Sequence, residues 1–133
     1  MNIDYSGLER RSSKRAKVNF IITYHVEKPL SLRMVMGLEK EFAALMLDLS
    51  EEGMGILTAY NIPVDAILSI KFILIDQNVN NEKFIKIALF GRVCYNLVLE
   101  KGERRLGICF TKIDKEDKLR ITDFVNRILP KMS

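Results

Sequence analysis

The stretch KFIKIALFGRVCYNLVL, residues 83–99, decides the fold class. Its large apolar residues recur at every second position: Ile85, Ile87, Leu89, Val93, Tyr95 and Leu97. Lys86, Arg92 and Asn96 fall on the positions between them. Because successive side chains of a β-strand point to opposite faces, this period of two predicts a strand with one buried face and one exposed face.

Three further segments on either side of this stretch have the composition of strands. Downstream, residues 104–113 alternate again after the hairpin-like loop EKGER. Upstream, residues 68–75 form a short apolar run, and residues 16–26 are rich in β-branched and aromatic side chains. Short strands separated by polar turns predict a barrel or a small sandwich.

The end of the chain changes from a strand pattern to a helix pattern. Asp114 and Asp117 resemble an N-cap and an acidic first turn. Apolar residues then follow at helical spacing: Ile121, Phe124, Val125, Ile128 and Leu129. We expect one amphipathic helix that packs on the barrel and ends at Pro130.

The segment GLEKEFAALMLDLS, residues 37–50, carries two conflicting signals. It is rich in helix formers, and Leu38, Phe42, Leu45 and Leu49 fit a helical stripe. Propensity alone therefore favours a helix that ends near Gly53, although tertiary context often overrides propensity in short segments.

Composition bounds the class of protein. The chain has 133 residues, enough for one domain with its own core, and a net charge of +4. No apolar run approaches the ~20 residues of a membrane helix, and the N-terminus has no apolar segment typical of a signal peptide. We expect a cytoplasmic protein without membrane insertion. Cys94 and Cys109 lie in apolar runs with no CxxC spacing, which predicts buried free thiols.

Basic side chains are concentrated in RRSSKR, residues 10–15. The guanidinium groups of Arg11 and Arg15 are planar and permanently charged, so they can bind a phosphate or a guanine edge in a bidentate manner. The stretch can equally be a solvated basic tail.

DLSEEGMG, residues 48–55, also allows two interpretations. Asp48 and Ser50 can cap a turn with their side-chain oxygens, and Gly53 can adopt a positive φ. The same residues could hold a guanine: a carboxylate accepts from its N1–H and N2–H groups, and a hydroxyl adds a contact.

Taken together, RxxxR followed by DxSxxG resembles the PilZ domain, the bacterial receptor module for the second messenger cyclic di-GMP. Gly55 and Ile56 also resemble the continuation of the family's second motif. The resemblance implies an all-β fold with one helix, a six-stranded antiparallel PilZ-type β-barrel plus a C-terminal α-helix. It makes residues 42–49 a strand, residues 1–15 a flexible N-terminal arm that carries RxxxR, and residues 16–133 the barrel domain with its helix.

The resemblance also implies ligand-binding roles for particular residues. Arg11 and Arg15 would bind the phosphates and guanine edges of cyclic di-GMP, and Asp48, Ser50 and Gly53 would hold a guanine on the barrel surface. In family members, an arginine at the position of Arg10 accompanies binding of a stacked pair of ligands. The sequence departs from the family in a longer connection, residues 27–42, and in Ala66, where a glycine is common.

We therefore expect a cyclic di-GMP receptor that orders its arm on binding and signals to an unidentified effector protein. The alternatives are a degenerate PilZ domain that binds only proteins and a β-barrel that binds nucleic acid; the first usually loses these motifs, and the second would use aromatic stacking. An enzyme is not expected, because His25 is the only histidine and no nucleophile or metal-ligand spacing occurs. No metal or cofactor is expected, and no nucleic acid as a partner.

Overall fold

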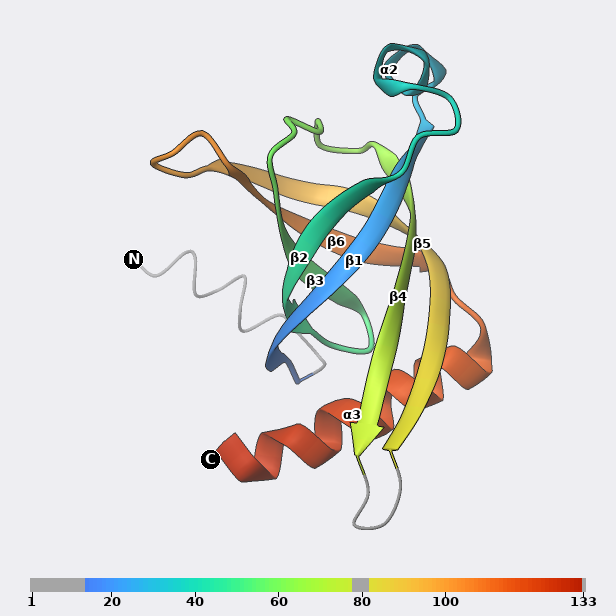
Figure 1. The fold of residues 1–133 in the computed structure, drawn as a ribbon, viewed down its shortest axis with the longest axis vertical. Helices are drawn as coiled ribbons and strands as arrows, with labels where there is room; N and C mark the ends of the chain where they lie inside the picture. The colour runs from blue at the N-terminus through green and yellow to red at the C-terminus, as the bar shows by residue number, and fades with distance from the viewer. Residues whose placement is uncertain (1–13, 78–81, 133) are drawn as a thin grey trace.

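The computed structural model describes residues 14–77 and 82–132, which form a β-barrel with a helix beneath it (Figure 1). The elements in chain order are β1 (Ala16–Lys28), α2 (Leu30–Met36), β2 (Phe42–Leu49), β3 (Gly53–Thr58), β4 (Ile67–Gln77), β5 (Glu82–Val98), β6 (Arg104–Lys112) and α3 (Lys115–Met132). The strands close in the order β1-β2-β3-β6-β5-β4, and every neighbouring pair is antiparallel. The six-stranded barrel with a C-terminal helix is thus confirmed.

Within residues 37–50, the segment with two conflicting signals, Phe42–Leu49 form the strand β2. The helix that propensity favours is wrong, and the strand that the family resemblance implies is confirmed. Phe42, Ala44 and Met46 alternate into the core, while Ala43 is exposed. Because β1 and β3 pair with β2 on its two edges, the ladder hydrogen bonds and this buried face outweigh a weak local preference for helix.

One hydroxyl pair lies among the apolar side chains of the barrel interior. The Tyr24 hydroxyl lies 2.8 Å from Thr58 Oγ1, and both residues are buried. Burial raises the pKa of the Tyr24 phenol, because the phenolate would lose its hydration, and the bond to Thr58 offsets only part of this effect.

α3 lies across one end of the barrel (Figure 1). Ile121, Phe124 and Val125 are buried, and the rings of Phe124 and Phe20 lie 5.7 Å apart. The amphipathic helix and its acidic first turn are confirmed. The expected end at Pro130 is wrong, since α3 continues to Met132; so close to a helix end, a proline removes only one backbone hydrogen bond.

The long connection after β1 folds into the short helix α2, which the sequence did not predict. Leu32 and Met36 pack against the core, and Gly37 ends the helix with a φ of 108°. No helix in the described part of the chain is both long and apolar enough to cross a bilayer.

The prediction of buried free thiols is wrong. Cys94 and Cys109 form a disulfide, and Cys109 is exposed. The register explains the pairing: β5 has an irregularity between Val93 and Tyr95, which brings Cys94 beside β6 with a Cα–Cα distance of 6.3 Å.

Candidate functional site

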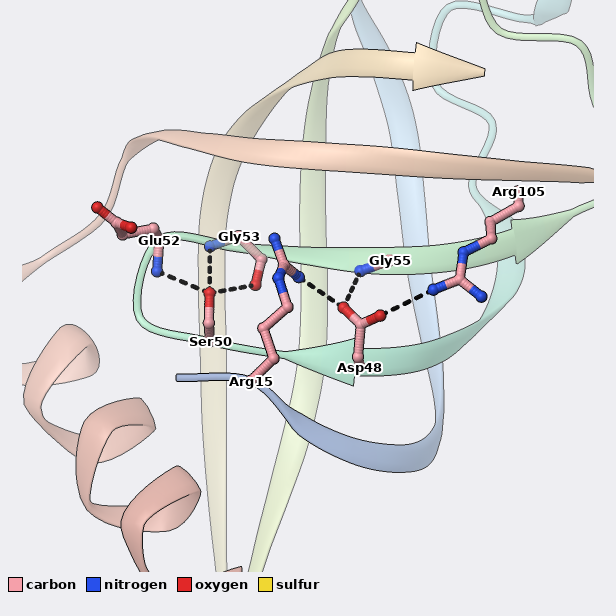
Figure 2. Close-up of polar contacts among 7 residues, drawn as sticks. All are labelled: Arg15, Asp48, Ser50, Glu52, Gly53, Gly55 and Arg105. Atoms are coloured by element: carbon pink, nitrogen blue, oxygen red, sulfur yellow. Dashed lines mark hydrogen bonds and ion pairs between the residues drawn. The ribbon is translucent and has the colours of Figure 1, made fainter. Parts of the chain in front are cut away.

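The Asp48 carboxylate lies at the centre of a charged cluster on the outside of the barrel (Figure 2). Its Oδ1 accepts a hydrogen bond from Arg15 Nη1 at 2.6 Å and another from the Gly55 backbone N–H at 2.9 Å. Its Oδ2 accepts from Arg105 Nη2 at 2.9 Å. Asp48 is in β2, Gly55 in β3 and Arg105 in β6, so three neighbouring strands and the residue before β1 build the Asp48 cluster.

The cluster is partly shielded from water, which strengthens its ion pairs. The Asp48 side chain is 16% exposed and that of Arg15 is 24% exposed. A hydrogen bond with the Tyr95 side chain raises the pKa of Arg105, and the negative charge of Asp48 adds a smaller effect in the same direction. Arg15 Nε is buried and has no hydrogen-bond partner among the described residues. It is a donor that an added acceptor could satisfy.

Ser50 holds the turn between β2 and β3. Its Oγ accepts hydrogen bonds from the backbone N–H groups of Glu52 at 3.2 Å and Gly53 at 3.1 Å, and its backbone N–H donates to the Gly53 carbonyl at 2.9 Å. Ser50 is only 1% exposed. The capping role that the sequence suggested for Ser50 is confirmed, whereas Asp48 acts across the strand ladder instead of within the turn.

Gly53 and Gly55 lie at two crowded positions of β3, the first against the backbone of β6 and the second against the side chains of the Asp48 cluster. A Cβ on Gly53 would lie 2.2 Å from the Ile108 carbonyl oxygen of β6. A Cβ on Gly55 would lie 3.0 Å from Asp48 Oδ2 and 3.3 Å from Arg105 Nη2. The expectation of a positive φ at Gly53 is wrong, because the glycines with positive φ in the described chain are Gly37 and Gly102. At Gly53, space is the constraint.

The structure brings together four of the residues that the sequence singled out: Arg15, Asp48, Ser50 and Gly53. Arg10 and Arg11 lie outside the described residues. Sequence reasoning missed Arg105 and Tyr95. The alternation in β6 does place Arg105 on the outward face, since Leu106 and Ile108 point inward. Only the strand register shows that this face meets Asp48.

The structure also bears on two other chemical possibilities, histidine chemistry and metal binding. His25 Nε2 contacts Glu27 Oε2 on the same strand, which gives the single histidine an ion-pairing partner when it is protonated. In residues 14–77 and 82–132, no group of three or more His, Cys, Asp or Glu side chains is placed to hold a metal ion.

Comparison with solved structures shows the same fold in other proteins. The inhibitor of motility MotI/DgrA of Bacillus subtilis superposes with a TM-score of 0.72 at 15% identity, over 92% of this chain and 52% of that one. The complex of K. pneumonia MrkH with c-di-GMP gives 0.62 at 12% identity, over 92% and 53%. The PilZ domain of Escherichia coli YcgR with c-di-GMP gives 0.58 at 12%, over 92% and 94%.

These identities establish the fold alone, and the chain spans about half the length of MotI/DgrA and MrkH. No curated protein sequence matches the chain. The family model of the PilZ domain, in contrast, matches residues 9–127, nearly the whole chain. The protein therefore belongs to the PilZ domain family.

Proposed function

We propose that this protein is a non-enzymatic, cytoplasmic receptor for cyclic di-GMP. The observation that carries the proposal is the Asp48 carboxylate, held on the barrel surface beside the Ser50–Gly53 turn and facing Arg15 of the RxxxR motif. The fold neighbours MrkH and YcgR, whose structures contain c-di-GMP, support the same ligand.

Ligand binding requires an exchange of partners at Asp48. An ionised carboxylate offers about four lone-pair positions, and Arg15, Gly55 and Arg105 occupy one each. A guanine that donates both N1–H and N2–H needs two of these positions, so at least one present donor must leave. Gly55 is fixed in the ladder and Arg105 is held by Tyr95. Arg15, which precedes β1, is therefore the donor that leaves.

The displaced Arg15 would then bind a phosphate of the same ligand. This exchange converts an internal ion pair into a charge-assisted contact with the nucleotide, and an acceptor on the ligand could also satisfy Arg15 Nε. Arg11 would bind a second phosphate or a guanine edge. Arg10 would support a second, stacked ligand molecule, and titration giving one ligand per chain would reject that role.

The exchange also links the ligand to the rest of the chain. Because Arg15 is the last residue of the arm, residues 1–15, moving its guanidinium from Asp48 to a phosphate would order the arm over the ligand. The surface offered to an effector protein would change as a result. Residues 16–133 would act as the scaffold for this step.

Isothermal titration with cyclic di-GMP tests the proposal, with GTP as the control ligand. We expect saturable binding of cyclic di-GMP and none of GTP. Arg15→Ala and Asp48→Ala should each weaken binding at least about tenfold, because a hydrogen bond to a charged group contributes roughly 1.5–3 kcal/mol. The matched control is Arg92→Ala, which breaks the exposed Arg92–Asp65 ion pair elsewhere on the barrel and should leave affinity unchanged.

Circular dichroism of each variant separates loss of binding from loss of folding. Unchanged affinity in folded Arg15→Ala or Asp48→Ala would remove that residue from the site. Absence of heat with wild-type protein would favour a PilZ module that binds only proteins. Tight binding of oligonucleotides with steep salt dependence, without competition by cyclic di-GMP, would favour the nucleic-acid alternative.

A further inference from the structure

The barrel is closed between β1 and β4 over only part of their length. The β1–β4 ladder runs from the Lys28–Ile67 pair to the Thr23–Lys71 pair and stops there. β4 continues to Gln77 and over that part pairs only with β5. Figure 1 shows β1 and β4 diverging toward α3. Among the described residues, one edge of β4 beyond Lys71 thus has no strand partner, and such an edge is a template for another strand.

An apolar groove of about 420 Å³ lies on the barrel surface where the strands diverge. β1, β4 and β5 supply its lining: Ile21, Thr23, Lys71, Phe72, Ile73, Lys86, Ile87 and Ala88. Ile21 is 68% exposed and Ile73 is 45% exposed. Farther along β4, Ile75 pairs across the ladder with Phe84, and both are exposed. Branched and aromatic side chains thus line this part of the surface without a cover.

Two lysines give the groove a positive charge. Lys71 pairs only loosely with Glu41, at 3.6 Å between two exposed side chains. Lys86 makes no ion pair with any described residue. Lys86 lies directly opposite Ile73 in the β4–β5 ladder, so a cation and an exposed isoleucine lie side by side in the groove.

We propose that an extended segment of a partner protein binds here by adding a strand to the free edge of β4, with both apolar and acidic side chains on its outward face, the face on which Lys71, Ile73 and Lys86 lie. Its backbone pairs with β4 beyond Lys71, its apolar side chains cover Ile21 and Ile73, and its carboxylates face Lys71 and Lys86. The free edge supplies hydrogen bonds, and alternate side chains supply specificity. Neither the Asp48 cluster nor its ligand takes part in this contact.

The charge of the groove disfavours a second copy of the same chain as the occupant. Two copies joined through their β4 edges would bring the lysines of one groove toward those of the other. Like charges at close range destabilise an interface, whereas an acidic segment neutralises both lysines.

The test uses the full chain without nucleotide and a fluorescent peptide about ten residues long, in which valine and glutamate take turns at every second position and threonine fills the positions between them. We expect saturable binding by anisotropy, and hydrogen-exchange protection of amides in residues 72–75. The same peptide with lysine in place of glutamate, and one with proline in place of threonine, serve as controls and should not bind, because the first repels Lys71 and Lys86 and the second cannot form the ladder.

Two variants locate the contact. Ile73→Asp should abolish detectable binding, and Lys86→Glu should weaken it about fivefold through loss of an exposed ion pair. Lys101→Glu, in the β5–β6 loop, is the matched charge control and should leave affinity unchanged. The proposal is overturned if the acidic peptide does not bind at millimolar concentration, if the proline peptide binds equally, or if Ile73→Asp and Lys86→Glu both keep wild-type affinity. Sedimentation showing a dimer that Ile73→Asp dissociates would also overturn it and assign the face to a second copy.

Discussion

Two sides of the same barrel are built differently. On the β2–β3–β6 side, β3 and β6 pass so close that Gly53 has no room for a Cβ, and a charged cluster is fixed beside Gly55. On the β1–β4 side, the strands separate beyond Lys71 and exposed isoleucines line a groove. The comparison teaches that fixed hydrogen-bond geometry for a polar ligand needs closely packed backbone, whereas an open seam leaves room for an added segment.

The closeness of β3 and β6 gives the largest expected effect. Gly53→Ala places a Cβ 2.2 Å from a backbone carbonyl oxygen that cannot move without displacing β6. We expect a loss of about 3 kcal/mol in the free energy of unfolding, at the upper end of overpacking effects. Urea denaturation measures it.

Gly102→Ala is the control for Gly53→Ala. Gly102 has a φ of 84° but no atom within 4 Å of an added Cβ, so backbone strain alone should cost about 1 kcal/mol. A loss at Gly53 no larger than that at Gly102 would show that β3 and β6 are not tightly held, and the contrast between the two sides would disappear.

The turn beside the Asp48 cluster gives the next largest effect. Ser50→Ala leaves the buried Gly53 N–H without its side-chain acceptor, which should cost about 1–2 kcal/mol in unfolding free energy. Ser31→Ala, at an exposed position in α2, is the matched control and should change stability little. Equal melting temperatures for the two variants would contradict a structural role for Ser50.

The smallest expected effect on stability comes from Tyr24, in the part of β1 that pairs with β4. Tyr24 lies opposite Ile70 in that ladder. Because the folded protein raises the pKa of Tyr24, an unfolded chain releases this proton at lower pH than the folded chain. The contribution of Tyr24 to the free energy of unfolding is therefore fully present below pH 10 and falls as the pH rises above it.

Tyr24→Phe should remove this alkaline loss of stability. At pH 8 the free energy of unfolding of the variant should be about 1 kcal/mol lower than that of wild type, the contribution of one hydrogen bond. As the pH rises above 10, the free energy of unfolding should fall less in the variant than in wild type. Urea denaturation across this pH range measures both slopes. Parallel curves at alkaline pH would mean that Tyr24 does not titrate differently in the folded state.

The regular part of the fold could be predicted from the sequence because it rests on local periodicity. The alternation around Ile87 and Leu89 defines β5, and the spacing of Ile121 and Val125 defines α3. Residues 42–49 could not be assigned from local preference, since their ladder partners in β1 and β3 decide the conformation. Their assignment as a strand came from the family resemblance.

The candidate site was predictable only where its residues lie in motifs. Arg15, Asp48, Ser50 and Gly53 were found in this way, whereas Arg105 is 57 residues from Asp48 and enters only through the register of β3 on β6. The Cys94–Cys109 disulfide escaped prediction for the same reason, because an irregularity in one strand decides which side chains meet. Long-range register is information that periodicity does not contain.

The wide sequence separations within the Asp48 cluster have a consequence for how the protein folds. Arg15 is 33 residues from Asp48, and Arg105 is 57 residues away on the other side. Closing such long loops is slow and entropically costly, so the β3–β6 pairing should be among the last contacts a newly made chain acquires. The cluster is then complete only after the barrel has closed, and chains that are still folding do not present it.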